Sequence, residues 1–469
     1  MFQRKEGSMR FGSLLIACML ACTVFLFKPP QVNADQLTDT EVGQFRALLE
    51  EQKLAKEAPA GALSDEEAGA VRGFLDQFKG ITFGGFVENF YQYESVDTPA
   101  GDNNAISPKV FDRQTQSFTV NNIELWLYKE VPNPGDIGFK ITLNWGDQAR
   151  RLTFVGPVYD DAHNQPIGGV APIAGQTGGR QATFSEAYVL WNIPIGKGIT
   201  AKFGKFATWV GYEVWESGWN PNFSRSYLYG WGIPFTNTGL GLNYPVTDRF
   251  TVDYYLTNTS DTFVNNNQSY THGTQLNYAV PDFLIFKDMN LHFDGLWGPE
   301  NPRTSTSNGE SKWTSRYDAS IAFSPMEKWT LVTNGNYSHN ASGYLQPSGR
   351  TLSSGQTWGV AQYIIYQHSE RIGAAVRGEY FWNEDNMAAM IFRPPGFEGS
   401  LDGATGSAIP GSLAEITATL NVRVKEKLLL RPEFRYDIIV DTPNATSQQW
   451  GKYGEKENTT FSFSTVYEF

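Results

Sequence analysis

The segment LLLRPEFRYDII, from Leu428 to Ile439, sorts its apolar and charged residues by parity. In a β-strand successive side chains point to opposite faces, so residues of one parity share a face. The even positions carry Leu428, Leu430, Phe434, Tyr436 and Ile438, and the odd positions between them carry Arg431, Glu433, Arg435 and Asp437. As a strand, this segment has one apolar face and one face with four charges, and its surroundings must suit both.

The same alternation recurs along the chain from Ile81 onward. Sixteen segments follow it, near 81–93, 117–130, 137–147, 181–193, 199–207, 237–245, 248–258, 272–281, 289–297, 314–324, 328–338, 355–367, 371–382, 413–424, 428–439 and 459–469. Short links that contain turn-forming residues, such as 131–136, alternate with long links, such as 148–180. This order places every short turn at one end of an antiparallel sheet.

A barrel in an outer membrane accounts for these features together. Such barrels combine strands of about ten residues, an even strand number, and short turns on one side with long loops on the other. The sequence therefore predicts an all-β fold, an antiparallel transmembrane β-barrel of about 16 strands. The apolar parity of 428–439 then faces lipid and the charged parity faces water inside the barrel, while Pro432 is expected to be a local defect or bulge.

A set of soluble β-sandwiches is the alternative fold. A sandwich would also alternate, because one face of each sheet is wet. It gives no reason for every second link to be long. It also does not explain aromatic residues near strand ends, which fit the interface girdles of a membrane barrel: Trp145, Trp191, Trp297, Trp358 and Trp382.

Residues 1–34 are expected to be a secretory signal peptide that is cleaved near Ala34. Arg4, Lys5 and Arg10 precede an apolar run at 11–27, and small or apolar residues occupy 32–34. A membrane anchor, or a lipoprotein cleavage box at 15–18, is the alternative. Both cysteines lie in this segment, so the mature chain is predicted to contain no disulfide.

Residues 35–80 are predicted to form a helical periplasmic extension ahead of the barrel at 81–469. Capping boxes at 38–41 and 64–67 each precede apolar residues at helical spacing. Neither helix is long enough to be stable alone, so both need a partner surface. A spacer or oligomerisation element, a plug in the lumen and a disordered tail are the three roles left open.

Charge and motif content exclude several classes of function. Without residues 1–34, the chain has 33 Lys and Arg against 48 Asp and Glu, which argues against nucleic acid as a partner. Neither a G-x-S-x-G elbow nor an H-E-x-x-H motif occurs, so no catalytic, cofactor-binding or metal-binding residue is predicted and the chain is not expected to be an enzyme. His292 and Asp294 could be half of a hydrolase site, but a solvated pair on the inner wall is the favoured interpretation.

The segment from Thr460 to Phe469 has an apolar face and ends on an aromatic residue. Phe463, Tyr467 and Phe469 resemble the C-terminal assembly signal of bacterial outer-membrane barrels. The resemblance implies the outer-membrane assembly machinery as a partner and the bacterial outer membrane as the location.

The stretch from Gly204 to Asn243 carries the most distinctive motifs of the chain. The motifs at 204–206, 211–213, 220–226 and 234–239 read Gly-Lys-Phe, Gly-Tyr-Glu, Asn-Pro-Asn-Phe-Ser-Arg-Ser and Pro-Phe-Thr-Asn-Thr-Gly. They resemble the OmpL-like outer-membrane β-barrel porin family of bacteria. The resemblance extends over 81–469 and implies a porin fold with passive passage of solutes.

The link 208–236 is the third long loop by this count, and in general porins that loop folds into the barrel and narrows the pore. Glu213, Glu216 and Arg225 are then the candidate charges of the constriction. The aromatic residues of the loop would pack it against the wall or form a greasy slide for sugars: Trp209, Tyr212, Trp215, Trp219, Phe223, Tyr227, Tyr229 and Trp231. A loop that covers the barrel mouth, with no role in a constriction, is the alternative.

Charges on the inner wall set the selectivity of a pore. The predicted register places seven basic and nine acidic residues on that wall, among them Arg377, Glu379, Arg431, Glu433, Arg435 and Asp437. This near balance predicts weak selectivity with a slight preference for cations.

Together these expectations describe an outer-membrane porin for passive diffusion of small hydrophilic solutes and ions. Two other functions stay open: a barrel whose loops act as an adhesin or surface receptor, and a plugged or gated channel. The expected partners are outer-membrane lipid, lipopolysaccharide, the solutes and the assembly machinery. A homotrimer is one open arrangement, although no residue establishes it.

Overall fold

A computed structural model of the chain describes residues 80–96, 109–112, 114–152, 159–160, 165–166, 182–258, 260–265, 267–283, 286–300, 313–340, 355–383, 412–441 and 456–469. The predicted signal peptide and residues 35–79 of the predicted helical extension lie outside these residues. Within the described ranges, no helix is long and apolar enough to cross a membrane.

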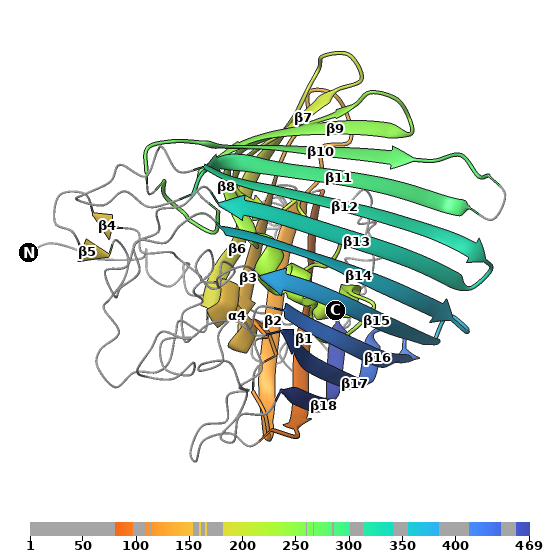
Figure 1. The fold of residues 1–469 in the computed structure, drawn as a ribbon. Helices are drawn as coiled ribbons and strands as arrows, with labels where there is room; N and C mark the ends of the chain where they lie inside the picture. Colours follow the sequence, from red (N-terminus) through yellow and green to blue (C-terminus); the bar gives the residue numbers. More distant parts are fainter. Residues whose placement is uncertain are drawn as a thin grey trace, which may run out of the picture. The chain divides into compact units, whose positions relative to one another are not determined.

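Sixteen strands of the described chain form one closed antiparallel barrel (Figure 1). The strands are β1 (Ile81–Glu94), β2 (Ser117–Lys129), β3 (Ile137–Trp145), β6 (Ala182–Ile193), β7 (Ile199–Ala207), β8 (Thr236–Pro245), β9 (Phe250–Thr257), β10 (Thr271–Ala279), β11 (Lys287–Pro299), β12 (Trp313–Met326), β13 (Trp329–Asn340), β14 (Gly355–Gln367), β15 (Ile372–Asn383), β16 (Ser412–Lys425), β17 (Leu428–Asp441) and β18 (Glu457–Glu468). Each strand pairs with its neighbour in sequence, and β1 pairs with β18 to close the barrel. The predicted fold class and strand positions are confirmed, with strand ends that differ by no more than two residues.

Strand β17 shows why this sequence forms a barrel wall. Arg431, Arg435 and Asp437 are 0% exposed on the inner face, whereas Phe434 on the outer face is 39% exposed. Pro432 points outward and still pairs with Phe463 of β18. Toward β16, the pairing of β17 is interrupted between the Thr419–Glu433 pair and the Val422–Leu430 pair, and it resumes in the same register. Pro432 is therefore a local gap in one ladder, which its missing N–H explains, and not a bulge.

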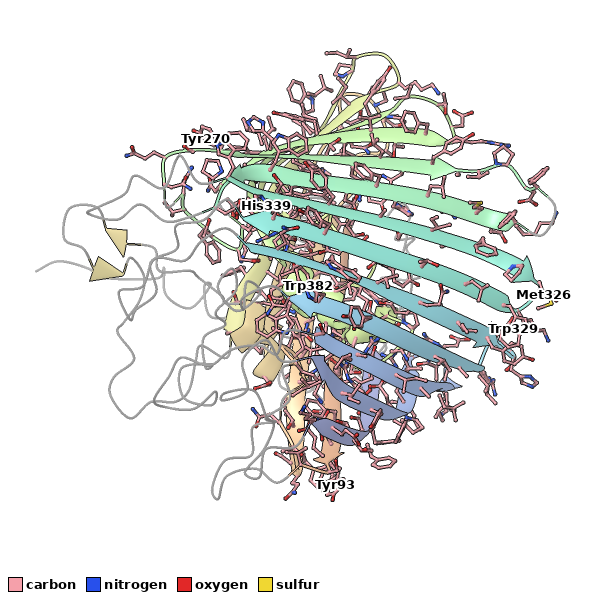
Figure 2. The ribbon with its side chains drawn as sticks, viewed as in Figure 1. Tyr93, Tyr270, Met326, Trp329, His339 and Trp382 are labelled. Carbon is pink, nitrogen blue, oxygen red and sulfur yellow. The ribbon has the colours of Figure 1, made fainter. Side chains whose placement is uncertain are left out.

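The two ends of the barrel differ in their connections. The links between β12 and β13 and between β16 and β17 contain two residues each, and all such short links fall at one end. We call this the short-turn end, which in outer-membrane barrels faces the periplasm. Trp329 lies at the short-turn end and Trp382 lies toward the opposite end, as expected for two aromatic girdles (Figure 2).

The longer links carry small elements of their own. Helix α4 (Asp147–Leu152) and the two-stranded β4 (Tyr159–Asp160) and β5 (Gln165–Pro166) follow β3. The link between β7 and β8 contains a 3₁₀ turn, η2 (Ser217–Trp219), and a π-helical turn, η3 (Leu228–Gly232). This link forms the candidate site.

Candidate constriction in the barrel lumen

The segment 208–235, which we call the inner loop, packs against the inner face of the barrel. Its residues Leu228, Trp231 and Ile233 are each 1% exposed. They belong to one buried cluster with residues from the inner faces of β13 to β17: Val332, Ala361, Tyr363, Phe381, Leu413 and Ile439. The expectation that this loop enters the lumen agrees with these contacts, whereas a loop that only covers the mouth does not.

Carboxylates of the wall accept hydrogen bonds from backbone N–H groups of the inner loop. Glu433 on β17 accepts from Phe223 at 2.7 Å and from Ser224 at 3.0 Å. Glu379 on β15 accepts from the N–H groups of residues 227 and 228 at 2.7 and 2.6 Å. Each side chain accepts from two successive backbone N–H groups, so these two residues fix the backbone of the loop.

Guanidinium groups of the wall donate to backbone carbonyl groups of the same loop. Arg431 donates to the carbonyl oxygens of Ser217 and, at 2.8 Å, of Asn220. Arg435 donates to the carbonyl oxygen of residue 225 at 2.7 Å and pairs with Asp437 at 2.8 Å. The inner wall therefore presents donors and acceptors in the pattern that an irregular backbone needs when it lies away from water.

This contact corrects one expectation from the sequence. Arg431, Glu433, Arg435 and Asp437 do lie on the inner face, but their exposure does not exceed 5%, so they do not face water. Their neighbours are the inner loop and one another. The physical reason is that buried polar groups of the loop require hydrogen-bond partners, and the wall charges supply them.

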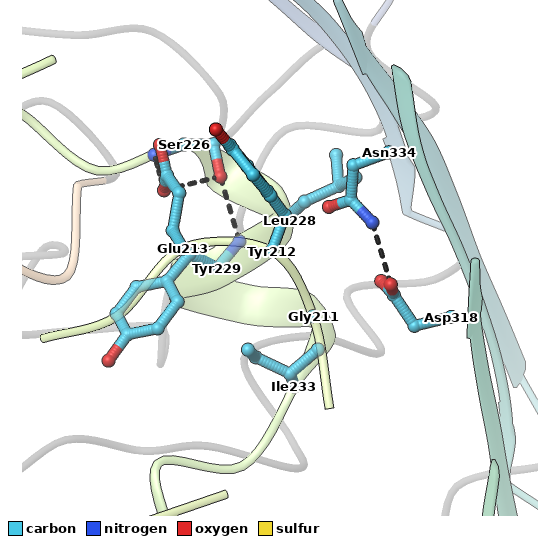
Figure 3. Close-up of a pocket in the computed structure, with 9 residues that line it drawn as sticks. All are labelled: Gly211, Tyr212, Glu213, Ser226, Leu228, Tyr229, Ile233, Asp318 and Asn334. Atoms are coloured by element: carbon cyan, nitrogen blue, oxygen red, sulfur yellow. Dashed lines mark hydrogen bonds between the residues drawn. The ribbon is translucent and has the colours of Figure 1, made fainter. Parts of the chain in front are cut away.

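Glu213 lies within this network and does not project into open solvent. Its carboxylate accepts from Arg377 of β15 at 2.7 Å and from both the N–H and the hydroxyl of Ser226 at 2.8 Å. Figure 3 shows Glu213 and Ser226 on the loop side of a narrow cavity, with Asp318 and Asn334 on the wall side. Asn334 donates to Asp318 at 2.6 Å. Glu213 therefore joins the loop to itself and to the wall.

Arg225 joins three segments of the long-loop end. Its guanidinium contacts Asp112 at 3.3 Å and donates to Gln148 of α4 at 2.8 Å and to the carbonyl oxygen of Trp215. It also stacks over the ring of Phe111, with 5.4 Å between the guanidinium carbon and the ring centroid. The structure thus brings the segment 109–112 and α4 onto the inner loop, a union that the sequence analysis missed because neither segment has a strand or family motif.

Glu216 differs from the other two predicted constriction charges. Its side chain is 5% exposed, and no ion pair to its carboxylate occurs among the described residues. Burial raises the pKa of Glu216 well above its usual range, and the charges of Glu124 and Glu186 add to this while Lys140 opposes it. The ionisation of Glu216 therefore depends on charged residues of the wall formed by β2, β3 and β6.

That wall carries its own polar network. Glu124 accepts from Asn144 at 2.6 Å and from the indole N–H of Trp215 at 3.2 Å. Glu186 pairs with Lys140 at 2.5 Å, and the Lys140 side chain keeps 26% of its exposure. A partly exposed ion pair on the inner face marks a place where the lumen is not filled by the loop.

The aromatic residues of the inner loop do not form a continuous slide. Of the eight predicted side chains, six are buried, Tyr212 is half-buried, and Trp219 is 53% exposed. Trp209 stacks on Tyr255 of β9 with 3.8 Å between ring centroids and 7° between ring planes. Most of these rings therefore attach the loop to the wall, which was one of the two expected roles.

The site thus consists of a polar and aromatic loop held inside an antiparallel membrane barrel, an arrangement that defines the chain as an outer-membrane barrel of the porin type. The model of the family "Putative beta-barrel porin-2, OmpL-like" matches residues 80–469, and the chain belongs to this family. It is accordingly a protein of the bacterial outer membrane with the character of a channel and not of an enzyme.

Solved structures similar to this chain include three outer-membrane proteins. They are OmpF of Salmonella typhi in complex with daunomycin (10% identity, TM-score 0.49, 83% of this chain and 97% of that chain), OprB of Pseudomonas putida at high pH (12%, 0.47, 86% and 97%) and the channel DcaP of Acinetobacter baumannii (9%, 0.47, 83% and 97%). At these identities and TM-scores the likeness carries no functional argument. No curated protein matches the chain.

Proposed function

We propose that this protein lets small hydrophilic solutes and ions diffuse passively across the outer membrane, and that the inner loop forms its constriction. The observation that carries this proposal is the attachment of the loop inside the lumen by Glu379, Arg431, Glu433 and Arg435. A loop held at so many points narrows the lumen to a fixed size, which is what a size filter requires.

The proposed route lies between the inner loop and the wall of β2, β3, β6 and β7. Inner-face residues of these strands, such as Tyr128, Lys140, Tyr188 and Lys202, are half-buried. On the opposite wall, Ala361 and Tyr363 are 0% exposed beneath the loop. The loop packs most closely on β13 to β17, although Ser217 and Trp215 also reach Glu88 of β1 and Glu124 of β2. We propose that solutes pass beside the half-buried side chains of β2, β3, β6 and β7.

The charges support weak selectivity. All nine acidic residues of the predicted inner wall are buried, whereas Lys140, Lys202 and Arg423 are half-buried. Lys140 and Arg423 each lie near a carboxylate, at 2.5 Å from Glu186 and 3.8 Å from Glu468. Lys140 and Arg423 are compensated in this way, and Glu379 and Glu433 bind the inner loop, whereas Glu216 has no ion pair among the described residues. We therefore propose that Glu216 sets the sign of selectivity, with a slight preference for cations when it is ionised.

Single-channel conductance in a planar bilayer, with the reversal potential under a KCl gradient, tests the proposal. Stable current steps are expected, with a small cation-selective reversal potential at a pH high enough to ionise Glu216. A strong anion preference would be consistent with an open channel but would contradict the role proposed for Glu216. The absence of any conductance from folded protein would overturn passive diffusion.

A plugged channel is the second candidate, and the burial of the inner loop favours it. In that case the inner loop would have to leave the wall before solutes pass. Assembly as a homotrimer, contact with lipopolysaccharide and recognition by the assembly machinery stay predictions, which are based on other outer-membrane barrels. So does the assembly role of Phe463 and Tyr467, whose side chains are 45% and 47% exposed on the outer face.

A further inference from the structure

Trp219 is the one aromatic residue of the inner loop whose side chain is largely exposed, at 53%. It ends the η2 turn, and its ring meets Trp126 of β2 edge-on, with 6.0 Å between centroids and 64° between planes. Trp126 in turn contacts Phe86 of β1 at 6.4 Å. These rings lie toward the short-turn end of the barrel, because Trp126 is near the end of β2 and Phe86 near the start of β1.

The position of Trp219 is fixed by buried groups. Arg431 donates to the carbonyl oxygens on either side of the turn, at residues 217 and 220. The hydroxyl of Ser217 donates to Glu88, and both side chains are 0% exposed. Since the backbone of the turn is held from two directions, Trp219 is presented to the lumen without an entropic cost of ordering the turn.

The wall has also been shaped to receive the second ring. A Cβ atom added at Gly84 would lie 2.7 Å from the indole of Trp126, closer than real contacts allow. A side chain at position 84 would therefore displace Trp126. Gly218 is less tightly constrained, because its Cβ would lie 3.3 Å from Val466 of β18, which would have to give by only a few tenths of an ångström.

A half-exposed ion pair borders the aromatic rings. Arg423 of β16 and Glu468 of β18 lie 3.8 Å apart, with side-chain exposures of 35% and 33%. The strand pairing places this ion pair beside the aromatic rings. Glu468 is opposite Phe86 on β1. Arg423 is opposite Leu429, which is in turn opposite Val466 of β18. The site thus combines an exposed indole with a charged donor and a charged acceptor.

We propose that Trp219 and Trp126, together with Arg423 and Glu468, form a sugar-binding subsite on the short-turn side of the constriction. A pyranose ring has an apolar face that packs on an indole and hydroxyl groups that a guanidinium and a carboxylate bind. A purely aromatic solute would use the indole and leave the ion pair unused. The subsite rests on the proposed function, because it gains a role only if solutes reach this part of the lumen.

The test measures binding separately from conduction. Maltotriose is titrated into purified protein in detergent by calorimetry, and its effect on single-channel current is recorded after addition to the short-turn side. Maltotriose is expected to bind and to block current transiently. Trp219→Ala is expected to weaken binding about tenfold, and Trp219→Phe, which keeps a ring, by less.

Two further variants define the ligand and the control. Arg423→Gln is expected to weaken the binding of maltotriose but to leave the binding of indole unchanged. Trp358→Ala removes a tryptophan that is 41% exposed on the outer face, and it should leave maltotriose binding intact. Equal binding of maltotriose by Trp219→Ala and by the wild type would overturn the subsite. Binding of indole alone would overturn the assignment to sugars.

The outcomes also separate this inference from the proposed function. Binding that depends on Trp219 in a protein without conductance would support the subsite and refute passive diffusion. Conductance without any binding of maltotriose would refute the subsite and support the channel.

Discussion

At the scale of single residues, the inner wall uses its charges to hold backbone. Arg377 is the clearest case, because it donates to Glu213 at 2.7 Å, to Glu415 at 2.5 Å and to the carbonyl oxygen of Ser224 at 2.7 Å. The side chain is 0% exposed. A charge buried in this way is tolerated only while its partners are present.

Replacement of Arg377 by alanine should therefore be costly. It leaves Glu213 and Glu415 buried without their cation, and loss of one partner of a buried pair costs about 3–5 kcal/mol. Equilibrium unfolding by urea in lipid vesicles measures the change. Lys197→Ala is the control, because the Lys197–Asp248 pair is exposed and should contribute less than about 1 kcal/mol. Equal losses for the two variants would contradict this account.

The role proposed for Glu216 predicts that the selectivity of the channel depends on pH. Its pKa is raised by burial and then by the charges of Glu124 and Glu186, with Lys140 opposing them. The raised pKa means that Glu216 stays protonated through the usual range for Glu and ionises only at higher pH. Cation preference should accordingly increase as the pH rises above the usual titration range of Glu.

Reversal potentials across that pH range provide the measurement. Glu216→Gln should remove the increase, because glutamine has nearly the same shape and does not titrate. The same pH dependence in Glu216→Gln would assign the effect to another group and would leave the cation preference without its proposed cause.

At the scale of elements, the strands were predictable and the attachment of the inner loop was not. Period-two alternation identified β17 to within two residues, because the two faces of a membrane barrel meet different solvents. The same parity placed Arg431 and Glu433 on the inner face. It could not show that they bind the loop, since this depends on the path of residues 208–235, which have no periodicity.

A cross-link between the inner loop and β16 tests whether the loop moves during conduction. Asn222 donates to Thr419 at 2.7 Å, so the two side chains meet, and cysteines at these positions are the pair to oxidise. The oxidised Asn222→Cys/Thr419→Cys protein should conduct as well as the reduced protein, because the proposed route lies on the other side of the loop. Loss of current on oxidation, restored by a reductant, would favour the plugged channel.

At the scale of the whole molecule, the outer face sets where the barrel resides. Phe434 and Phe461 contact each other across β17 and β18 with 5.2 Å between ring centroids, and they are 39% and 53% exposed. Such exposed rings are unfavourable in water but suit hydrocarbon. The alternation of apolar and polar residues that predicts the strands therefore also predicts that the outer face of the barrel contacts lipid.

Phe434→Arg tests this assignment. Arginine on the lipid face near the bilayer midplane should destabilise the barrel by about 2–4 kcal/mol, whereas Phe434→Leu should cost less. Unfolding in vesicles of defined thickness measures both. A negligible effect of Phe434→Arg would show that position 434 does not face the hydrocarbon core.

The attachment of the inner loop also has a consequence for the order in which the molecule is made. Ser217 and Arg431 are separated by 214 positions, and the other β15 to β17 anchors lie 151 to 211 positions from the loop residues that they bind. The inner loop is synthesised and secreted before the strands that carry those anchors. Its polar backbone therefore has no wall partners until these strands arrive. Contacts between such distant positions form slowly. Docking of the inner loop should thus be a late event of biogenesis, coupled to the arrival of the last strands.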